Sequence, residues 1–194
     1  MLRDSAYWDE FYSLEHDEIK EPSKFAKFIF NNFLRNKNKA SLIEFGCGNG
    51  RDSLYFNAKG IDVVAIDGSH IAIENLQKQN QKASWICADF TAPLNLKDKF
   101  DICYSRFTLH AIDDIAELGL IKNVKNLLKP SGLFVVEARS INDDKFGVGK
   151  AVGEREFISD GHYRRFIDPD IFKANLTQNG FKIVDIDESS EFAP

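Results

Sequence analysis

Residues 40–67 read ASLIEFGCGNGRDSLYFNAKGIDVVAID, and this stretch decides the fold. An apolar run at 40–45 leads directly into a glycine-rich turn, then into a helical segment, and then into a second apolar run at 62–66. Short apolar runs that alternate with helical segments are typical of strand, helix, strand units with parallel, buried strands. The stretch therefore predicts an α/β protein whose doubly wound, mainly parallel sheet lies between two layers of helices, a three-layer αβα arrangement.

The same alternation continues to the end of the chain and gives six expected strands. Helix signals separate them, the clearest being Asp168 as an N-cap with Pro169 as the first helical residue. Another helix is expected to begin near Asp113 and to end before Pro130, and a leading helix to begin at Ser23. The expected strands are 40–45, 62–66, 83–87, 100–105, 133–138 and 181–186.

The length of 194 residues suits one domain with a sizeable core, so we expect a single domain over 1–194. Two places depart from short connections. The first is the aromatic and acidic stretch at 7–12, and the second is the segment 140–166, which holds four glycines and shows no clear periodicity. Connections this long inside compact domains are usually functional or disordered. We interpret this segment as a lid over the acceptor.

Composition excludes several classes of function. The net charge of −5 gives no positive field to attract phosphate backbones, which disfavours non-specific nucleic-acid binding. The three cysteines, Cys47, Cys87 and Cys103, lack metal-ligand spacing, and their odd number argues against a disulfide framework, so we expect no metal and a reducing cytoplasm. Residues 1–18 contain no apolar run of signal-peptide or membrane-span length, so we expect neither export nor membrane insertion.

Glycine and carboxylate residues follow three successive expected strands. Gly46 and Gly48 lack a Cβ, so the backbone there can bend sharply and approach a ligand closely. Asp67 ends the second strand, 21 residues after Gly46, where a carboxylate can accept hydrogen bonds from both hydroxyls of a ribose. Asp89 follows the third strand, placed to accept from an adenine amine. Taken singly, each Asp is more often a cap or turn residue, and the glycines alone are more often part of a tight strand-to-helix turn. Together they predict a nucleoside-containing ligand at the carboxyl edge of the sheet.

The segments LIEFGCGNGRDSLYFNAKGIDVVAIDGS, CADF and FDICYSRFTLHAI resemble motifs one to four of the class I S-adenosylmethionine-dependent methyltransferases. The resemblance covers roughly residues 40–140 and implies a Rossmann-like methyltransferase fold with S-adenosylmethionine as cofactor. The seventh, antiparallel strand of that family has no counterpart in the pattern. Carried over by position, the resemblance implies cofactor contacts at Tyr7, Trp8, Glu44, Gly46, Cys47, Gly48, Arg51, Asp67, Gly68, Asp89, Phe90, Ser105 and Arg106.

The wording GNGRDSLYFNAKG, with YWDEFY upstream, is similar to the thiopurine-methyltransferase-like branch of this family. In that branch an N-terminal aromatic segment folds over the cofactor, so the resemblance implies that 1–39 forms a covering segment and helix. Ordinary packing of a terminal segment is the alternative for these aromatic residues.

Fewer residues in the sequence indicate how the methyl acceptor is bound and activated. Methyl transfer depends largely on positioning, but an oxygen or nitrogen acceptor can need a general base, for which His110 and Tyr163 are candidates. A packing or capping role is the alternative for His110. Adjacent arginines in GHYRRF present planar forks suited to an anionic group, with surface ion pairs as the alternative. The expected acceptor-binding residues are Tyr12, Arg139, His162, Arg164 and Arg165.

The segment from Arg139 through GHYRRFID is also similar to bacterial methyltransferases that modify small molecules or surface polysaccharides. The sequence thus predicts methyl transfer to an oxygen, nitrogen or sulfur atom of a small acceptor, anionic or carbohydrate in nature. Two alternatives stay open. An NAD-dependent oxidoreductase would use a similar turn, although its G-x-G-x-x-G fingerprint meets Arg51 here, and a methyltransferase-like fold can serve as a non-catalytic binding subunit.

Overall fold

The computed structural model describes residues 5–14, 21–37, 39–79 and 83–192. No helix within these ranges is both long enough and apolar enough to cross a lipid bilayer. The elements are, in chain order, α1 (Ser5–Leu14), α2 (Lys24–Ile29), the π-helical turn η1 (Phe30–Leu34), β1 (Ser41–Phe45), α3 (Arg51–Ala58), β2 (Asp62–Asp67), α4 (His70–Lys78), β3 (Ser84–Cys87), β4 (Phe100–Arg106), the 3₁₀ turn η2 (Leu109–Ala111), α5 (Asp114–Leu127), β5 (Leu128–Glu137), β6 (Lys150–Ala151), β7 (Glu156–Ser159), β8 (His162–Arg165) and α6 (Pro169–Gln178).

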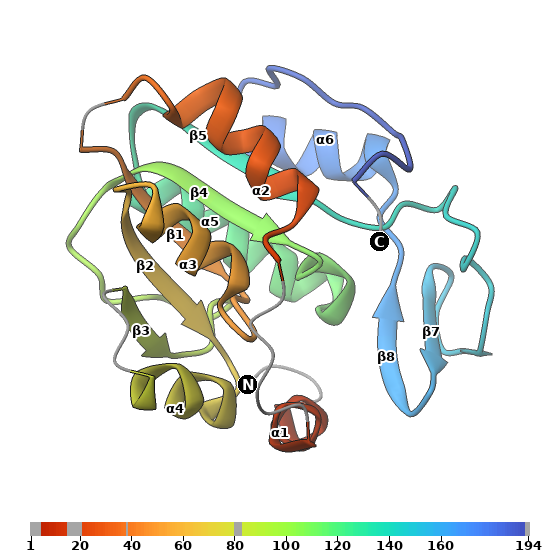
Figure 1. Cartoon of the computed structure of the whole chain (residues 1–194). Coiled ribbons are helices and arrows are strands. Elements are labelled where there is room, and N and C mark those ends of the chain that lie inside the picture. Colours follow the sequence, from red (N-terminus) through yellow and green to blue (C-terminus); the bar gives the residue numbers. More distant parts are fainter. Residues whose placement is uncertain (1–4, 15–20, 38, 80–82, 193–194) are drawn as a thin grey trace.

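Five strands form a parallel sheet in the order β3-β2-β1-β4-β5 (Figure 1). At the end of β1, Phe45 lies opposite Ile66 of β2 and Ser105 of β4. The chain reverses its direction of winding between β1 and β4, and ligands of open α/β sheets bind at such a point, outside the carboxyl ends of the strands. The expected doubly wound fold is confirmed.

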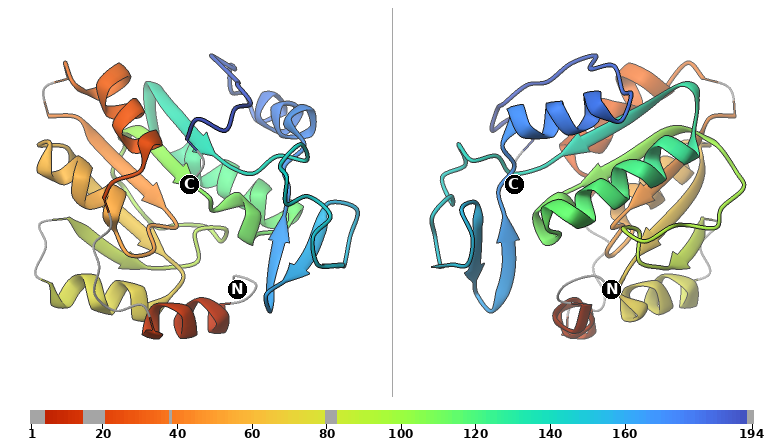
Figure 2. Two further views of the ribbon diagram at one scale, coloured as in Figure 1. Left: turned by 45° about the vertical axis from the view of Figure 1, so that its right-hand side comes forward. Right: turned by 180° about the vertical axis from the view of Figure 1, so that it is seen from behind.

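Helices cover both faces of the sheet (Figure 2). Because side chains alternate along a strand, neighbouring residues of β1 belong to different cores. Leu42 packs with Phe56 of α3 and with residues of α2 and α4 on one face. Ile43 packs with Val124 of α5 and Phe172 of α6 on the other face. The three layers follow from this alternation.

The expected helix starts are also confirmed. Ser23, Asp113 and Asp168 each have extended backbone and accept hydrogen bonds from N–H groups in the first turn of α2, α5 and α6 respectively. These are the caps that satisfy the unpaired donors of a helix start. Each cap fixes where the preceding loop ends.

The sixth expected strand, 181–186, is wrong. Phe181 and Ile183 pack against the core formed with α5 and α6, while Val184 is 73% exposed, so the alternation read from the sequence does exist. A strand also needs a partner for its backbone hydrogen bonds. In the described part of the chain no strand joins the sheet beyond β5, and this segment runs as irregular chain.

The segment 140–166 is more regular than its composition indicates. Residues 150–165 form an antiparallel sheet in the order β6-β7-β8, which projects beside the main sheet (Figure 1). Asp160 and Gly161 connect β7 to β8, with φ of 52° and 81°. A two-residue turn with both φ values positive is the preferred hairpin connection, and an Asp-Gly pair is its usual sequence. The expectation of a segment without periodicity is therefore corrected.

Candidate functional site

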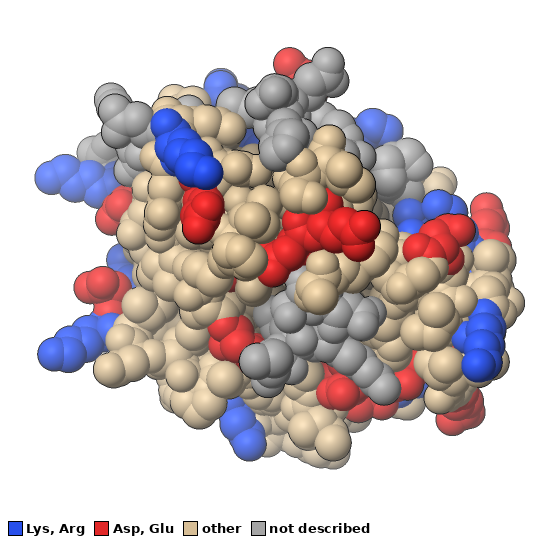
Figure 3. Space-filling model, turned by 90° about the horizontal axis from the view of Figure 1, so that it is seen from below, with Lys and Arg blue, Asp and Glu red and all other residues tan. Residues whose placement is uncertain are grey.

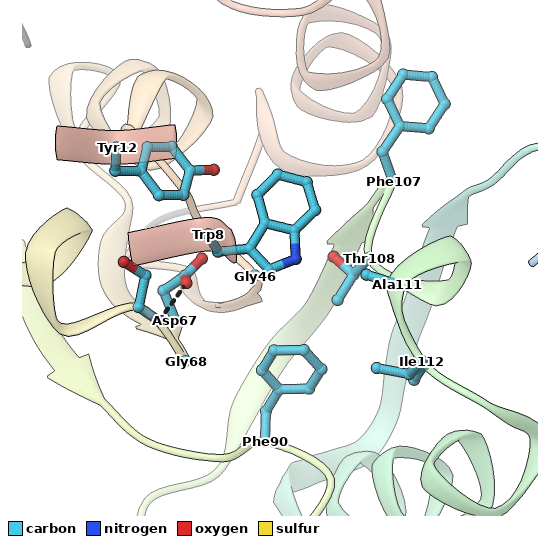
Figure 4. A pocket seen from close by; sticks show the side chains of 11 residues that line it. Trp8, Tyr12, Gly46, Asp67, Gly68, Phe90, Phe107, Thr108, Ala111 and Ile112 are labelled. Atoms are coloured by element: carbon cyan, nitrogen blue, oxygen red, sulfur yellow. Dashed lines mark hydrogen bonds between the residues drawn. The ribbon is translucent and has the colours of Figure 1, made fainter. Parts of the chain in front are cut away.

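A pocket lies where the switch point of the sheet predicts it, at the carboxyl ends of β1, β2 and β4 and next to α1 (Figure 4). Its empty volume, which includes open space at the mouth, is about 520 Å³. It is lined by Trp8, Tyr12, Gly46, Asp67, Gly68, Ser69, Phe90, Phe107, Thr108, Ala111 and Ile112.

The glycine-rich turn after β1 forms one wall. Gly46 and Gly48 have φ of 73° and 53°, values that residues with a Cβ rarely adopt. A Cβ at Gly46 would lie 2.6 Å from the hydroxyl oxygen of Thr108, and one at Gly48 would lie 2.3 Å from that of Tyr12. Glycine therefore suits both positions for two reasons: the positive φ disfavours a residue with a Cβ, and neighbouring side chains leave no room for one.

Asp67 ends β2 at the pocket wall, and its side chain is buried. Its two carboxylate oxygens accept hydrogen bonds from the backbone N–H groups of Gly48 and Ser69, both at 2.8 Å. Burial raises the pKa of Asp67, and these hydrogen bonds act against that rise. The carboxylate is thus held in one orientation, and each oxygen keeps a second lone pair to accept a hydrogen bond from a ligand.

Asp89 is partly buried and does not line the pocket, although Phe90 beside it does. Burial acts to raise the pKa of Asp89, but the pKa is lowered on balance, in part by hydrogen bonds to one carboxylate oxygen from the Thr91 hydroxyl at 2.5 Å and the Thr91 N–H at 3.0 Å. The side chain therefore also shapes the turn after β3. Its adenine contact stays a prediction.

Helix α1 contributes two aromatic side chains to the pocket. Figure 4 shows Trp8 projecting toward the middle of the pocket, with Tyr12 beside it on the same helix. Asp9 anchors the helix to the start of α4: it accepts from the Ser69 hydroxyl at 2.6 Å and pairs with His70 Nδ1 at 2.9 Å. The N-terminal segment thus lies against the pocket, as the covering role requires.

Several expected cofactor residues lie behind the pocket wall. Burial, with Asp52 and Asp67 nearby, raises the pKa of Glu44 well above its ordinary value, and the Ser53 hydroxyl donates to its carboxylate. Ser105 is fully buried. Other expected residues outside the lining are Tyr7, Cys47, Gly48, Arg51 and Arg106.

The strand β8 divides the expected acceptor residues between two environments. Arg165 is 1% exposed and forms ion pairs with Glu117, at 2.6 Å, and with Asp114 of α5. Tyr163, on the same side of the strand, is 2% exposed. These placements argue against an acceptor-binding role for Arg165 and a catalytic role for Tyr163. His162 instead stacks on Tyr7 of α1, with ring centroids 4.6 Å apart.

His110 lies in η2, within the pocket-lining stretch that follows β4. Burial, together with the nearby positive charges of Arg164 and Arg139, lowers its pKa to about 3. The imidazole is therefore neutral at pH 7. A group that holds a proton so weakly is a poor general base at neutral pH, which argues against the expected catalytic role.

The sequence did not indicate the wall that follows β4. Phe107, Thr108, Ala111 and Ile112 line the pocket, as does Ser69 after β2. Phe107 has φ of 53°, an uncommon value for an aromatic residue and one found more often at functional sites. No residue type in the segment FTLHAI predicts this bend. The position of the segment directly after the fourth strand does, however, predict that it lies at the carboxyl edge of the sheet.

The charge around this end of the molecule is predominantly acidic. In Figure 3, which shows the molecule from below, acidic side chains gather at the centre of the face, and the Lys and Arg side chains lie mainly toward its edges. A surface of this kind does not attract a phosphate backbone.

Comparison with known proteins agrees with this geometry. Residues 14–186 match the methyltransferase domain family. The chain is 29% identical over 100 residues to a malonyl-[acyl-carrier protein] O-methyltransferase of Pseudescherichia vulneris, covering 51% of this chain and 39% of that protein. It is 28% identical over 107 residues to TehB of Haemophilus influenzae, described as a probable S-adenosyl-L-methionine-dependent methyltransferase, covering 53% and 37%.

Among solved structures, the CcbJ methyltransferase from Streptomyces caelestis superposes with a TM-score of 0.74 at 13% identity, covering 94% of this chain and 90% of that one. A likeness at this identity concerns the fold alone. The protein belongs to the class I S-adenosylmethionine-dependent methyltransferases, with S-adenosylmethionine as its cofactor. The aligned part of this chain spans less than two fifths of the length of these curated relatives.

Proposed function

We propose that this protein transfers a methyl group from S-adenosylmethionine to an oxygen, nitrogen or sulfur atom of a small acceptor. The observation that carries the proposal is the pocket at the switch point, which combines the glycine turn at Gly46 with the carboxylate of Asp67. Membership of the methyltransferase family gives no support to the alternative of an NAD-dependent oxidoreductase. The turn that borders the pocket also lacks the G-x-G-x-x-G fingerprint of dinucleotide-binding proteins.

The residues present fit the cofactor. When bound, S-adenosylmethionine supplies an electrophilic methyl group on a sulfonium. Gly46 lines the pocket and lets a ligand approach the backbone closely, Asp67 can accept hydrogen bonds from hydroxyl groups, and Phe90 offers an apolar wall. We further propose the adenine role for Asp89 and supporting roles for the other expected cofactor residues behind the wall.

Catalysis by this chain would rest mainly on positioning. Trp8 and Tyr12 of α1 and the hairpin of β7 and β8 approach the site from two sides, and Tyr7 meets His162 between them. Enclosure of this kind orients two reactants and excludes water. We therefore propose that 1–39 covers the cofactor and that 140–166 forms the acceptor side of one domain.

A pair of glycine variants tests the proposal. Gly46→Ala places a Cβ 2.6 Å from the Thr108 hydroxyl oxygen in the pocket, whereas Gly60→Ala meets nothing within 4 Å, and both positions have positive φ, 73° and 83°. Isothermal titration with S-adenosylhomocysteine should show binding to the wild type and to Gly60→Ala. Binding to Gly46→Ala should be at least about tenfold weaker, because the added Cβ forces the turn or Thr108, which also lines the pocket, to shift.

The same titration separates the alternatives. If S-adenosylhomocysteine does not bind while NAD does, the proposal fails. Cofactor binding without turnover of any acceptor class, measured by methyl incorporation, would favour a non-catalytic binding subunit. The proposed acceptors include carbohydrates and anionic metabolites, as expected for the thiopurine-methyltransferase-like or polysaccharide-associated branches.

A further inference from the structure

Strand β8 presents its two adjacent arginines to opposite faces. Arg165 points into the core toward its carboxylate partners on α5. Because successive side chains of a strand alternate, Arg164 shares the other face with His162. That face is turned toward α1, since the His162 ring stacks on Tyr7 and lies 6.0 Å, centroid to centroid, from Trp8, which lines the pocket. Arg164 therefore faces the pocket side.

Three guanidinium groups surround the wall formed by Phe107 and His110. The Arg106 guanidinium lies 4.3 Å from the centroid of the Phe107 ring, and that of Arg139 lies 5.3 Å from it. The rings of Phe107 and His110 are 5.9 Å apart, and β8, which carries Arg164, packs against η2, which carries His110. Positive charge is thus concentrated beside a residue that lines the pocket.

Carboxylates compensate two of these three charges. Arg106 pairs with Glu137 at 2.6 Å, and Arg139 pairs with Asp143 at 2.7 Å. Both pairs are mostly buried, with side chains between 11% and 19% exposed. Pairs of this kind are held in place and do not need a further anion.

The third charge has no such partner. Arg164 donates from Nε to Nε2 of His162 at 2.8 Å, and this nitrogen accepts the hydrogen bond without supplying a negative charge. Among residues 5–14, 21–37, 39–79 and 83–192, no carboxylate lies within 4.0 Å of the Arg164 guanidinium. Close by, Nδ1 of His110 is enclosed and has no hydrogen-bond partner. A partly buried cation and an unused polar atom therefore flank the same space.

We propose that Arg164, together with His110, binds an anionic group of the methyl acceptor, either a carboxylate or a phosphate. The proposal rests on the proposed function, because it identifies this space as the acceptor side of the pocket. The terminal nitrogens of Arg164 form a planar fork that matches the oxygens of such a group, and an imidazole N–H at Nδ1 can donate to one of them. An anion here would also supply the negative charge that the cluster lacks.

The test uses the full chain with three probes that share one ring: benzoate, phenyl phosphate and benzyl alcohol. Isothermal titration is done on protein saturated with S-adenosylhomocysteine and on protein without it. Benzoate or phenyl phosphate should bind at least about tenfold more tightly than benzyl alcohol, because only the anions gain charge-assisted hydrogen bonds. The stronger of the two anions identifies the group as carboxylate or phosphate.

Three variants locate the binding. Arg164→Gln should weaken anion binding at least about tenfold and leave S-adenosylhomocysteine binding unchanged, while Arg164→Lys, which keeps the charge but loses the fork, should fall between. Lys150→Gln removes an equal charge from an exposed position on β6 of the same small sheet and should change nothing.

Equal anion affinity in wild type and Arg164→Gln would overturn the proposal, as would equal binding of benzyl alcohol, equal weakening by Lys150→Gln, or no binding of any probe to protein that binds S-adenosylhomocysteine. Anion binding that depends on Arg164 in a chain that does not bind S-adenosylhomocysteine would support the anion site and overturn the proposed function.

Discussion

Asp67→Asn tests the residue that links the fold to the proposed cofactor site. The substitution keeps the size of the side chain, but one of its two hydrogen-bond acceptors becomes an NH₂ group. In the structure both oxygens accept from backbone N–H groups, of Gly48 and Ser69, at 2.8 Å. The NH₂ group of the new Asn must therefore face the backbone N–H of either Gly48 or Ser69, so that this buried N–H loses its acceptor. The loss should lower the free energy of unfolding by about 1 to 3 kcal/mol.

Binding of the cofactor should suffer separately. A hydrogen bond to a charged group contributes about 1.5 to 3 kcal/mol, so loss of the carboxylate should raise the Kd for S-adenosylhomocysteine by about 10- to 100-fold. Isothermal titration measures the Kd and urea unfolding measures stability, both under conditions where the variant is folded. Asp62→Asn is the control, because it makes the same change at the exposed start of the same strand. An unchanged Kd for folded Asp67→Asn would refute the reasoning that Asp67 contacts the ligand.

Two further predictions concern the hairpin and the pocket wall. Arg165→Met should lower the free energy of unfolding by about 3 to 5 kcal/mol in urea, since Glu117 is 2% exposed and would lose its partner. Adding Glu117→Gln should restore part of this loss, and no restoration would contradict the ion-pair explanation. The second prediction concerns His110, whose pKa falls from 6.5 to about 3 on folding. Between these two pH values the imidazole binds a proton in the unfolded chain but not in the folded chain. The free energy of unfolding should therefore decrease as the pH falls from 6.5 toward 3. Between pH 7 and pH 5 this should cost the wild type about 1 to 2 kcal/mol more than His110→Gln, and identical pH profiles in urea unfolding would show that folding does not lower the pKa of His110.

The parts of the site that depend on local sequence were predictable. Gly46 and Asp67 follow strands that the apolar runs identify, and parallel strands bring their carboxyl ends to one edge. The sequence therefore located both residues without any knowledge of the packing. Phe107 was not predictable in the same way, because its place in the wall depends on a left-handed bend, φ 53°, that its residue type does not favour.

The sequence-based predictions for the C-terminal segment and for the hairpin were wrong for different reasons. The alternation at 181–186 correctly separated packed from exposed side chains, but no periodicity can say whether a neighbouring strand exists to pair with. The hairpin, in contrast, did have a local signal: Asp160-Gly161 is a standard two-residue turn. Only the short strands around it, of four residues each, kept the periodicity too brief to detect.

The sequence alone could not predict which of the adjacent residues Arg164 and Arg165 faces the pocket. Strand geometry dictates that two adjacent side chains point in opposite directions, so one of the two had to leave the pocket. Which one leaves is decided by Asp114 and Glu117, about fifty residues earlier in the chain, whose carboxylates reach Arg165 from α5. Burying Arg165 is tolerable only because these carboxylates compensate its charge, and this fixes the register of β8 against η2. The same register turns Arg164 toward α1 and the pocket, so the buried ion pair on one face of β8 determines which cation is offered to a ligand on the other.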